Sequence, residues 1–506
     1  MSSKIISYDL GTGGLKASLF SDSGELLGFE FESYPSYNLS SHIQEQAPSD
    51  WWGAIVSSTQ RLLRTTKVDP NEIVSLAISG HSLGVVPIDK EGNLLVDKTP
   101  IWSDKRAHKQ SAEFFEKVDY ESWYRATGSG FPAECYSIFK IMWYRDNLPE
   151  IFSQVDCILG TKDYCNFLFT GRRATDHSYA SGSGVYSLLG MNYCEEYISA
   201  SGIDPKILPE ILDSTAVVGT ISEEASRQTG LPMGVKIISG GVDNSCMALG
   251  AGGYRDGHLY TSLGSSAWIA LSSTKPVLNF ETKPYVFAHV VRGMYASATC
   301  IFSAGTSLSW VLDNLYTDLS GDQKYIDLAK MASESTVGAN GLIFNPSLAG
   351  GSMLEESANI VGGFVGLNLS HNRCDMMRAT LEGIAMNLRI ALDELMNESG
   401  LQSEMLMVGG GAKSPYWMGL FANIYGLKVL KSSVDQECAS LGAAALAAVG
   451  AGLWSDFSPI DAQHTIEAVY ETDADIKSRY DELLPRFRKL SRYLSEFGDM
   501  LNGENI

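Results

Sequence analysis

The chain has 506 residues, of which 44% are hydrophobic and 19% are charged, values that are typical of globular domains and argue against disorder or a fibrous repeat. Acidic residues outnumber basic ones and give a formal net charge of −21 with a pI of about 4.8, so the surface should repel phosphate backbones and nucleic acid is not expected as a partner. The eight cysteines form no C-x-x-C pair, which indicates reduced thiols in a cytoplasmic protein rather than a disulfide or zinc framework.

The sequence predicts two large lobes and no membrane segment. A chain of this length is several times the size of one typical domain. Asp9 interrupts the apolar start before a signal core could form. The longest uncharged run, 438–455, consists mostly of Ala and Gly, so we expect a buried helix there rather than a membrane span.

The first half predicts an α/β lobe that opens on antiparallel strands. Short apolar runs at 5–10, 15–20 and 26–31 are separated by turns, and 73–79 and 85–88 read as further strands. We expect helices at 50–65, 104–118 and 137–147, with Asp50 as the N-cap of the first.

The second half begins in the same style. A strand at 259–263, the turn Gly264-Ser265-Ser266 and a returning strand at 267–271 repeat the opening pattern half a chain later. Helical spacing of apolar residues predicts a long helix at 375–397 with one buried face. A strand at 405–408 runs into three glycines, helices follow at 415–425 and 439–449, and the charged tail from 476 should be a surface helix.

The turn after the first strand could hold a phosphate group. Gly residues in Gly11-Thr12-Gly13-Gly14 let backbone N–H groups approach an anion closely. Thr12 adds a hydroxyl, Lys16 a positive charge, and Asp9 a hard oxygen suited to Mg²⁺. A tight hairpin that needs glycine explains this turn equally well. The segment is not a dinucleotide fingerprint, because Lys16 stands at the sixth position of G-x-G-x-x-G, and it is not a P-loop, because no Gly-Lys-Ser or Gly-Lys-Thr occurs.

Two glycine-containing turns of the second half have the same character. Gly264-Ser265-Ser266 could face the first turn, so that the two clamp a polyphosphate from both lobes. Gly409-Gly410-Gly411-Ala412-Lys413-Ser414 lies between a strand and a helix, where a nucleotide could meet the helix N-terminus. Simple strand-to-helix packing is the alternative for the latter.

A carboxylate follows directly on another predicted strand. In Gly240-Gly241-Val242-Asp243-Asn244, Asp243 is well placed to accept the proton of a substrate hydroxyl. The alternative is an Asp that caps the helix beginning near Ser245. His81 and Asp104, at the ends of N-terminal strands and close to Trp102 and Arg106, have the composition of a polyol site, although a histidine at a strand end is more often structural.

Together these segments resemble the FGGY carbohydrate kinases, nearest to xylulokinase-type pentulose kinases, over almost the whole chain. Asp9-Leu10-Gly11-Thr12 and Gly264-Ser265-Ser266 resemble the two phosphate motifs of the family, and the 409–415 segment matches its adenosine motif almost letter for letter. The C-terminal signature is present as Gly362-Gly363-Phe364-Val365-Gly366-Leu367 with Asp375, Ala379 and Glu382. Lys140-Ile141-Met142-Trp143 is similar to the N-terminal signature, from which Tyr144 and Cys135 depart.

The resemblance implies an α/β fold of two actin-like ATPase (ribonuclease H-like) lobes with a central cleft. The expected lobes are 1–246 for sugar and phosphate and 247–506 for the nucleotide. By resemblance Asp243 is the general base, the sugar meets His81, Asp104, Asp243 and Asn244, and Asp9 and Asp243 hold Mg²⁺. The implied nucleotide-binding residues are Thr12, Gly13, Gly14, Lys16, Gly264, Ser265, Gly305, Gly410, Gly411 and Ser414.

The expected function is ATP-dependent phosphorylation of a sugar or polyol in the cytoplasm, with xylulose as the first candidate and a homodimer as the implied assembly. Leu83 stands where xylulokinases carry a His, and Gly350-Gly351-Ser352-Met353-Leu354 replaces their Gly-Glu-Arg-Thr-Pro stretch, so ribulose, gluconate and a deoxy-ketose stay open. Glycerol is disfavoured because Ser82 and Leu83 replace an Arg-Glu pair. A non-catalytic actin-like nucleotide-binding regulator is the alternative from another class.

Overall fold

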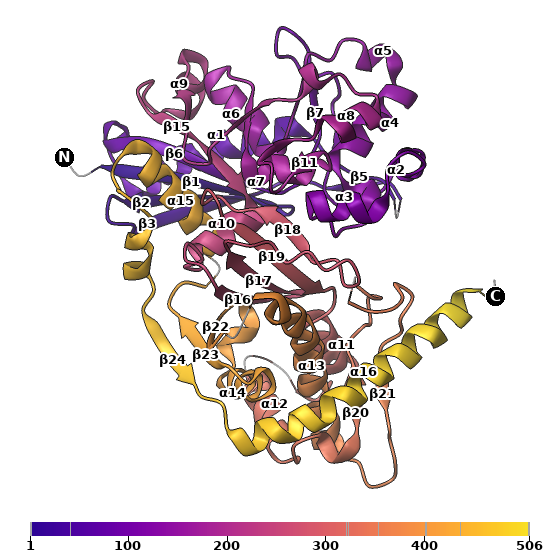
Figure 1. The fold of residues 1–506 in the computed structure, drawn as a ribbon. Coiled ribbons are helices and arrows are strands. Elements are labelled where there is room, and N and C mark those ends of the chain that lie inside the picture. The colour runs from indigo at the N-terminus through magenta and orange to yellow at the C-terminus, as the bar shows by residue number, and fades with distance from the viewer. Residues whose placement is uncertain are drawn as a thin grey trace.

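The computed structural model describes residues 3–40, 42–319, 321, 323–352, 354–399, 402–435 and 437–503. Two α/β lobes lie one above the other, the first half of the chain forming most of the upper lobe and the second half most of the lower one (Figure 1). Over the described ranges, no helix is long and apolar enough to cross a membrane.

The N-terminal lobe is built on a mixed six-stranded sheet of order β14-β15-β6-β1-β2-β3. The strands β1 (Lys4–Leu10), β2 (Gly14–Ser21) and β3 (Leu26–Ser33) form the expected antiparallel meander. Strands β6 (Ile73–Gly80) and β15 (Lys236–Val242) continue the sheet in parallel with β1, and β14 (Val217–Thr220) closes it in antiparallel sense.

Helices cover both faces of this sheet, which explains why β1 is buried along most of its length. On one face Ile6, Tyr8 and Leu10 share a core with Trp51 and Ile55 of α1 (Pro48–Thr66), and α6 (Thr161–Thr170) contacts β15. On the other face Ile5 and Phe20 pack with the alanines of α15 (Cys438–Ala451). The N-terminal lobe is completed by the elements α2 (His108–Phe115), α4 (Ser137–Asn147), β7 (Val86–Ile88), β10 (Ala174–Asp176) and α7 (His177–Ala180).

The C-terminal lobe carries a seven-stranded sheet of order β18-β19-β17-β16-β22-β23-β24. Its strands are β16 (His258–Leu263), β17 (Ala267–Ser273), β18 (Tyr285–Ala288), β19 (Tyr295–Ile301), β22 (Glu404–Val408), β23 (Lys428–Ser432) and β24 (Ile466–Tyr470). Helix α13 (Arg373–Ser399) packs on β17 and β19, α14 (Pro415–Tyr425) packs on β23, and α11 (Gly305–Leu315) follows β19.

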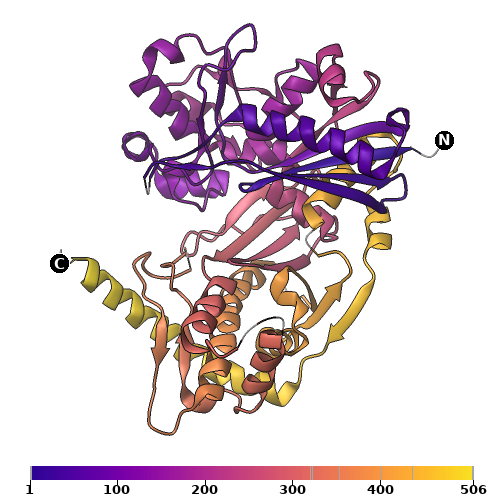
Figure 2. The ribbon, with the colours of Figure 1, turned by 180° about the vertical axis from the view of Figure 1, so that it is seen from behind.

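Helix α10 (Asp243–Gly250) lies at the junction of the lobes, packed against α15 and in contact with β15 of one sheet and β17 and β19 of the other. The two helix backbones approach so closely that a Cβ at Gly250 or Gly442 would lie 1.8 or 1.9 Å from a carbonyl oxygen of the partner helix. The small residues of the 438–455 run therefore serve close helix packing. Figure 2 shows α15, although late in the sequence, beside the N-terminal sheet, and the Ser75 hydroxyl donates to Ala447 O at 3.1 Å.

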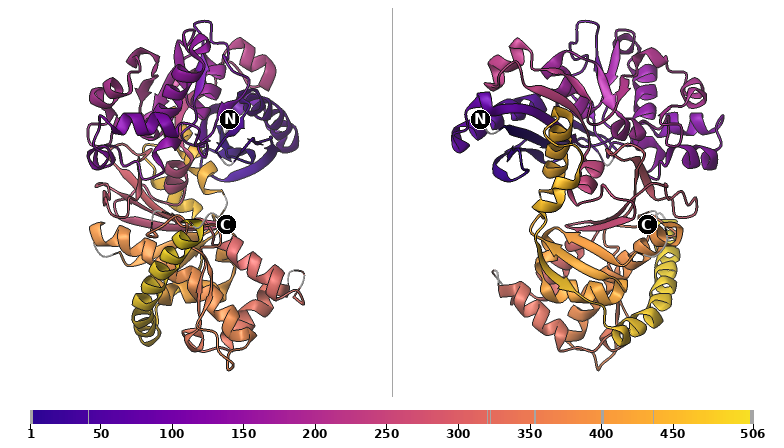
Figure 3. Two further views of the ribbon diagram at one scale, coloured as in Figure 1. Left: turned by 90° about the vertical axis from the view of Figure 1, so that its right-hand side faces the viewer. Right: turned by 60° about the vertical axis from the view of Figure 1, so that its left-hand side comes forward.

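Two local expectations were wrong, and the boundary between the lobes stays a prediction. The helix predicted at 104–118 is confined to α2, and Asp50 lies in the first turn of α1, whose N-cap is Ala47. The tail forms α16 (Ala474–Gly503) along the outside of the C-terminal lobe (Figure 3), but it is amphipathic and buries Tyr480 and Phe487 in the core. The boundary expected at 246/247 falls inside α10.

Candidate active site

Three parallel strands end side by side and bring the N-terminal candidate residues to one sheet edge. Leu10 of β1 pairs with Gly80 of β6, which also pairs with Val242 of β15. Gly11, His81 and Asp243 are the residues that directly follow these three strands. Open α/β sheets bind ligands at the carboxyl ends of their parallel strands.

Two buried carboxyl groups at this edge, those of Asp9 and Asp243, have raised pKa values. Burial, reinforced by the negative charge of Asp9, raises the pKa of Asp243 to about 7. Burial also raises the pKa of Asp9, against a hydrogen bond of 3.1 Å from the Ser79 hydroxyl and the charge of Lys16, its cross-strand partner. Asp243 is the first residue of α10 and Val242 is the N-cap, so Asp243 does not cap this helix. Its Oδ1 accepts the N–H of the next residue, Asn244, at 2.8 Å.

The turn between β1 and β2 is held by hydrogen bonds at Gly11 and Thr12 and has free space beside Gly13. Gly11 N donates to Gly14 O at 3.0 Å, and the Thr12 carbonyl accepts from Gln46 Nε2 at 2.7 Å. Trp102 Nε1 donates to the Thr12 hydroxyl at 3.0 Å. No protein atom lies within 4 Å of the position that a Cβ at Gly13 would occupy. The turn is therefore held by its neighbours while one flank stays free.

The three glycine segments of the C-terminal lobe are in direct contact. Ala267 pairs with Ile301 across β17 and β19, which places the start of α11 beside the second turn, and Gly305 N donates to Gly264 O at 3.0 Å. A Cβ at Gly305 would lie 2.5 Å from that oxygen, so only glycine fits there. Ser262 pairs with Val408 in the parallel ladder of β16 and β22, and this pairing brings the Gly409 turn to the same edge.

The adenosine-motif residues form a short 3₁₀ turn before α14. Gly410 has no protein atom within 4 Å of where its Cβ would be, whereas a Cβ at Gly411 would meet the Leu263 side chain at 2.4 Å. Ser414 is the N-cap of α14 and accepts from Trp417 N at 3.4 Å. Gly410 thus presents free space next to a capped helix start.

Two sets of contacts join the turns of the two lobes. Lys16 Nζ of the N-terminal lobe lies 3.6 Å from Glu437 Oε1, just before α15. Two residues earlier in the chain, the carboxylate of Asp435 accepts the N–H of Gly409. A row of aromatic rings, with centroid separations of 6.2, 4.0 and 6.0 Å, leads from one lobe to the other through Trp102, Phe131, Tyr285 and Trp268. Trp102 donates to the first turn and Trp268 lies two residues after Ser266 of the second, so the row of rings connects the surroundings of both phosphate-turn candidates.

His81 is a buried histidine without a partner. Its side chain is 1% exposed, its ring packs edge-on against Trp51 at 5.5 Å, and neither ring nitrogen has a hydrogen-bond partner in the structure. Burial, with the positive charge of Lys140 as a second cause, lowers its pKa to about 4, so the ring is neutral. An unpaired buried polar group is costly, which makes this imidazole a candidate for bonding a ligand hydroxyl.

Asp104 has its carboxylate occupied by protein groups. The side chain is 0% exposed, and it binds Arg106 through both oxygens, with Nε to Oδ1 at 2.8 Å and Nη2 to Oδ2 at 2.7 Å. Gln44 N donates to Oδ2 at 2.7 Å. In this arrangement Asp104 fixes Arg106 and the chain at Gln44, and a sugar contact from Asp104 stays a prediction.

The segments that carry His81 and Asp104 are tied together by Lys140. Its ammonium group is fully buried and donates to Leu83 O at 3.1 Å and to Ile101 O at 2.6 Å. Leu83, where xylulokinases carry a His, is buried and has φ of 60°, an uncommon conformation for a leucine. Of the second departing segment, Met353 lies outside the described residues.

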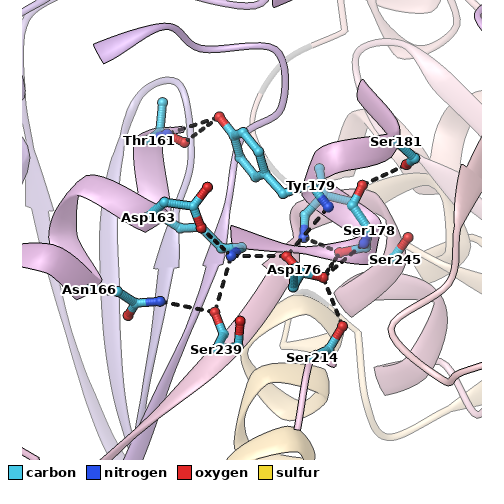
Figure 4. Close-up of polar contacts among 12 residues, drawn as sticks. Thr161, Asp163, Asn166, Asp176, Ser178, Tyr179, Ser181, Ser214, Ser239 and Ser245 are labelled. Atoms are coloured by element: carbon cyan, nitrogen blue, oxygen red, sulfur yellow. Dashed lines mark hydrogen bonds and ion pairs between the residues drawn. The ribbon is translucent and has the colours of Figure 1, made fainter. Parts of the chain in front are cut away.

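Sequence reasoning missed a buried charge network in the N-terminal lobe, formed by Lys162, Asp163 and Asp176 (Figure 4). Lys162 Nζ lies 2.5 Å from Asp163 Oδ1 and 2.9 Å from Asp176 Oδ1, and it donates to Ser239 O at 3.1 Å. All three charged side chains are fully buried. The signal was a Lys-Asp pair inside an otherwise apolar segment, 157–169, because charged residues are rarely buried without partners.

Comparison with known proteins identifies both halves of the chain. The model of the FGGY family of carbohydrate kinases, N-terminal domain, matches residues 4–250, and that of the C-terminal domain matches 259–451. A xylulose kinase of Bacillus subtilis is 27% identical over 499 residues, covering 98% of each chain. A gluconate kinase from Lactobacillus acidophilus superposes with a TM-score of 0.90 at 25% identity, covering 98% of this chain and 99% of that one. A xylulose kinase from the same organism gives 0.89 at 25% identity, covering 97% and 98%.

Proposed function

The chain belongs to the FGGY family of carbohydrate kinases and is an ATP-dependent sugar kinase, and on that premise we propose that it phosphorylates a terminal hydroxyl of a ketopentose, with xylulose as the first candidate. The observation that carries the proposal is Asp243, a carboxylate with a raised pKa at the start of α10, the helix that contacts the sheets of both lobes.

Asp243 is the proposed general base. A carboxyl group with a pKa of about 7 can take the proton of an attacking sugar hydroxyl and is still ionised in a large fraction of molecules near neutral pH. The hydroxyl oxygen then forms a bond to the γ-phosphorus of ATP while the bond to the ADP oxygen breaks. Most of the remaining rate acceleration in phosphoryl transfer comes from positioning and charge neutralisation.

The phosphates are assigned to Thr12, Gly13, Gly14 and Lys16 of one lobe and to Gly264 and Ser265 of the other, and the rest of the nucleotide to Gly305, Gly410, Gly411 and Ser414. The open flanks at Gly13 and Gly410 support this assignment.

Sugar kinases of this family use ATP with a divalent metal, and we propose Mg²⁺. Among the described residues no group of three or more His, Cys, Asp or Glu side chains could hold a metal, and Mg²⁺ needs only one or two carboxylates, here Asp9 and Asp243, beside phosphate oxygens. The ion would neutralise phosphate charge.

The sugar is assigned to His81, Asp104, Asp243 and Asn244 in the N-terminal lobe. The buried, unpaired imidazole of His81 supports a hydroxyl-bearing ligand. The relatives named xylulose kinase favour xylulose, and the structural likeness to a gluconate kinase keeps gluconate as the second candidate. Release of ADP should be measured with xylulose, ribulose, gluconate and a deoxy-ketose at equal concentration. The highest kcat/KM is expected with xylulose, and a preference for gluconate would overturn the ketopentose assignment.

Three further expectations complete the proposal. Residues 1–246 form the sugar and phosphate lobe and 247–506 the nucleotide lobe, with α15 contributed by the second to the first sheet. The enzyme is cytoplasmic and forms a homodimer. Sedimentation velocity over a range of concentrations tests the assembly, and a monomer at every concentration would contradict it.

A further inference from the structure

The buried charge network of Lys162, Asp163 and Asp176 is connected by hydrogen bonds to the backbone next to Asp243. Asp176 ends β10 and receives hydrogen bonds at Oδ2 from the backbone N–H of Ser178 at 2.9 Å, the Ser178 hydroxyl at 2.5 Å and the Ser214 hydroxyl at 2.7 Å. Its other oxygen is held by Lys162. This carboxylate is therefore fixed from several sides (Figure 4).

The Ser178 hydroxyl has only one way to point in this arrangement. It carries a single proton, which it donates to Asp176 Oδ2. Its lone pairs then face away from Asp176, and one accepts the N–H of Val242 at 2.9 Å. Val242 is the N-cap of α10 and the residue immediately before Asp243. Asp176 therefore orients the Ser178 hydroxyl, and this hydroxyl holds the backbone N–H of Val242 at the start of α10.

A second tie holds the same helix start from the other lobe. The Ser245 hydroxyl donates to Ala288 O of β18 at 3.2 Å, and Ala288 N donates to the Ser181 hydroxyl at 3.2 Å. Ser181 in turn donates to Ser178 O at 2.7 Å. The backbone on both sides of Asp243 is therefore anchored through the segment 178–181.

We propose that Ser178, oriented by Asp176, is a positioning residue that sets the place of Asp243 in the active site. The inference rests on the proposed function, because it takes Asp243 as the base. Ser178 is fully buried and does not face substrate in this scheme, so it acts on turnover and not on binding. A displacement of a reacting group by about 1 Å can cost about 100-fold in rate.

Two serine variants separate positioning from general stability. Ser178→Ala removes the acceptor of the Val242 N–H together with one hydrogen bond to Asp176. Ser214→Ala removes an equivalent hydrogen bond to the same carboxylate oxygen, while the bond from Gly240 N to Ser214 O uses the backbone and is kept. Both serines are buried, so both variants should lower the melting temperature, Ser178→Ala by more because it also leaves the Val242 N–H without its acceptor.

Only Ser178→Ala should lower kcat, by about 10–100-fold, with the KM values for ATP and sugar little changed. Amide hydrogen exchange over 240–245 should be faster in Ser178→Ala than in the parent and in Ser214→Ala. If Ser178→Ala does not fold, Ser178→Cys keeps the side-chain volume with a much weaker acceptor.

Unchanged kcat in the Ser178 variant, equal losses of kcat in both variants, or unchanged exchange over 240–245 would each overturn the inference. A parent enzyme that phosphorylates no sugar would overturn the proposed function instead, and the exchange measurement would still decide whether Ser178 holds Val242.

Discussion

At the scale of single residues, the ionised carboxylate of Asp243 should lower the free energy of unfolding, because burial disfavours its charge. Its pKa is about 7 in the folded chain and close to the ordinary aspartate value of 3.8 when the chain is unfolded. Between these values the folded state binds more protons, so the contribution of this carboxyl to the free energy of unfolding falls as pH rises from about 4 to 7.

Asp243→Asn should therefore be more stable than the parent at pH 8, by roughly 1–3 kcal/mol, and the difference should shrink toward pH 4. Urea unfolding in the presence of a chelator measures this without bound metal. Equal stabilities of the two proteins at pH 8 would contradict a raised pKa of Asp243 in the folded state.

His81 offers a second residue-scale prediction. His81→Phe keeps the ring beside Trp51 and removes both unpaired nitrogens, so the free energy of unfolding should be unchanged or higher. If an imidazole nitrogen bonds the sugar, KM for the sugar should rise by about 3–10-fold while KM for ATP stays constant, as expected for loss of one neutral hydrogen bond. An unchanged sugar KM would remove His81 from the sugar site.

At the scale of elements, the hairpin turns should behave as ligand-binding segments. Gly13→Ala meets no protein atom within 4 Å and should leave stability nearly unchanged, but its methyl group would occupy the space assigned to phosphate. We expect the affinity for ATP, measured by calorimetry, to fall at least about tenfold, as when close backbone approach to a phosphate is blocked. Gly53→Ala, at an equally open site on the exposed side of α1, is the matched control and should bind ATP like the parent. Normal ATP binding by Gly13→Ala would move the phosphates elsewhere.

Element prediction from sequence worked where short-range pattern decides the structure. Apolar runs interrupted by glycine turns located β1, β2, β16 and β17, and the helices at 137–147 and 415–425 have the predicted bounds. It was wrong for Asp50, because Ala47 and Pro48 already start α1, and for 104–118, where the helix begins only at His108.

The arrangement of the candidate site residues could be predicted from the sequence only in part, for a related reason, and their roles stay predictions. Candidate residues at strand ends could be found because each lies next to an apolar run, and the register of β1, β6 and β15 then brings three of them together. The role of Ser178 and the occupied carboxylate of Asp104 depend on contacts between segments far apart in the chain, and no local pattern encodes those.

At the scale of the whole molecule, the helix pair α10 and α15 connects the two sheets through backbone contact at Gly250 and Gly442. Gly442→Ala would place a Cβ 1.9 Å from Cys246 O, which requires the helices to separate and displaces the helix that starts with Asp243. We expect this variant to lose at least about 2 kcal/mol of stability, since overpacking typically costs 1–3 kcal/mol, and most of its kcat. Thermal unfolding and turnover measure the two effects. Gly419→Ala, whose Cβ would meet its nearest neighbour at 3.9 Å, is the control and should keep both.

The account depends on one base, Asp243, which takes the proton of a sugar hydroxyl while the nucleotide is bound at the junction of the lobes. Its most direct test is the sugar-dependent release of ADP by Asp243→Ala, compared with the parent, with ATP binding followed by calorimetry in the same preparation. The account predicts that turnover falls by about 100–10,000-fold, as for loss of a general base, while ATP still binds. Turnover near that of the parent, with ATP bound, would contradict it.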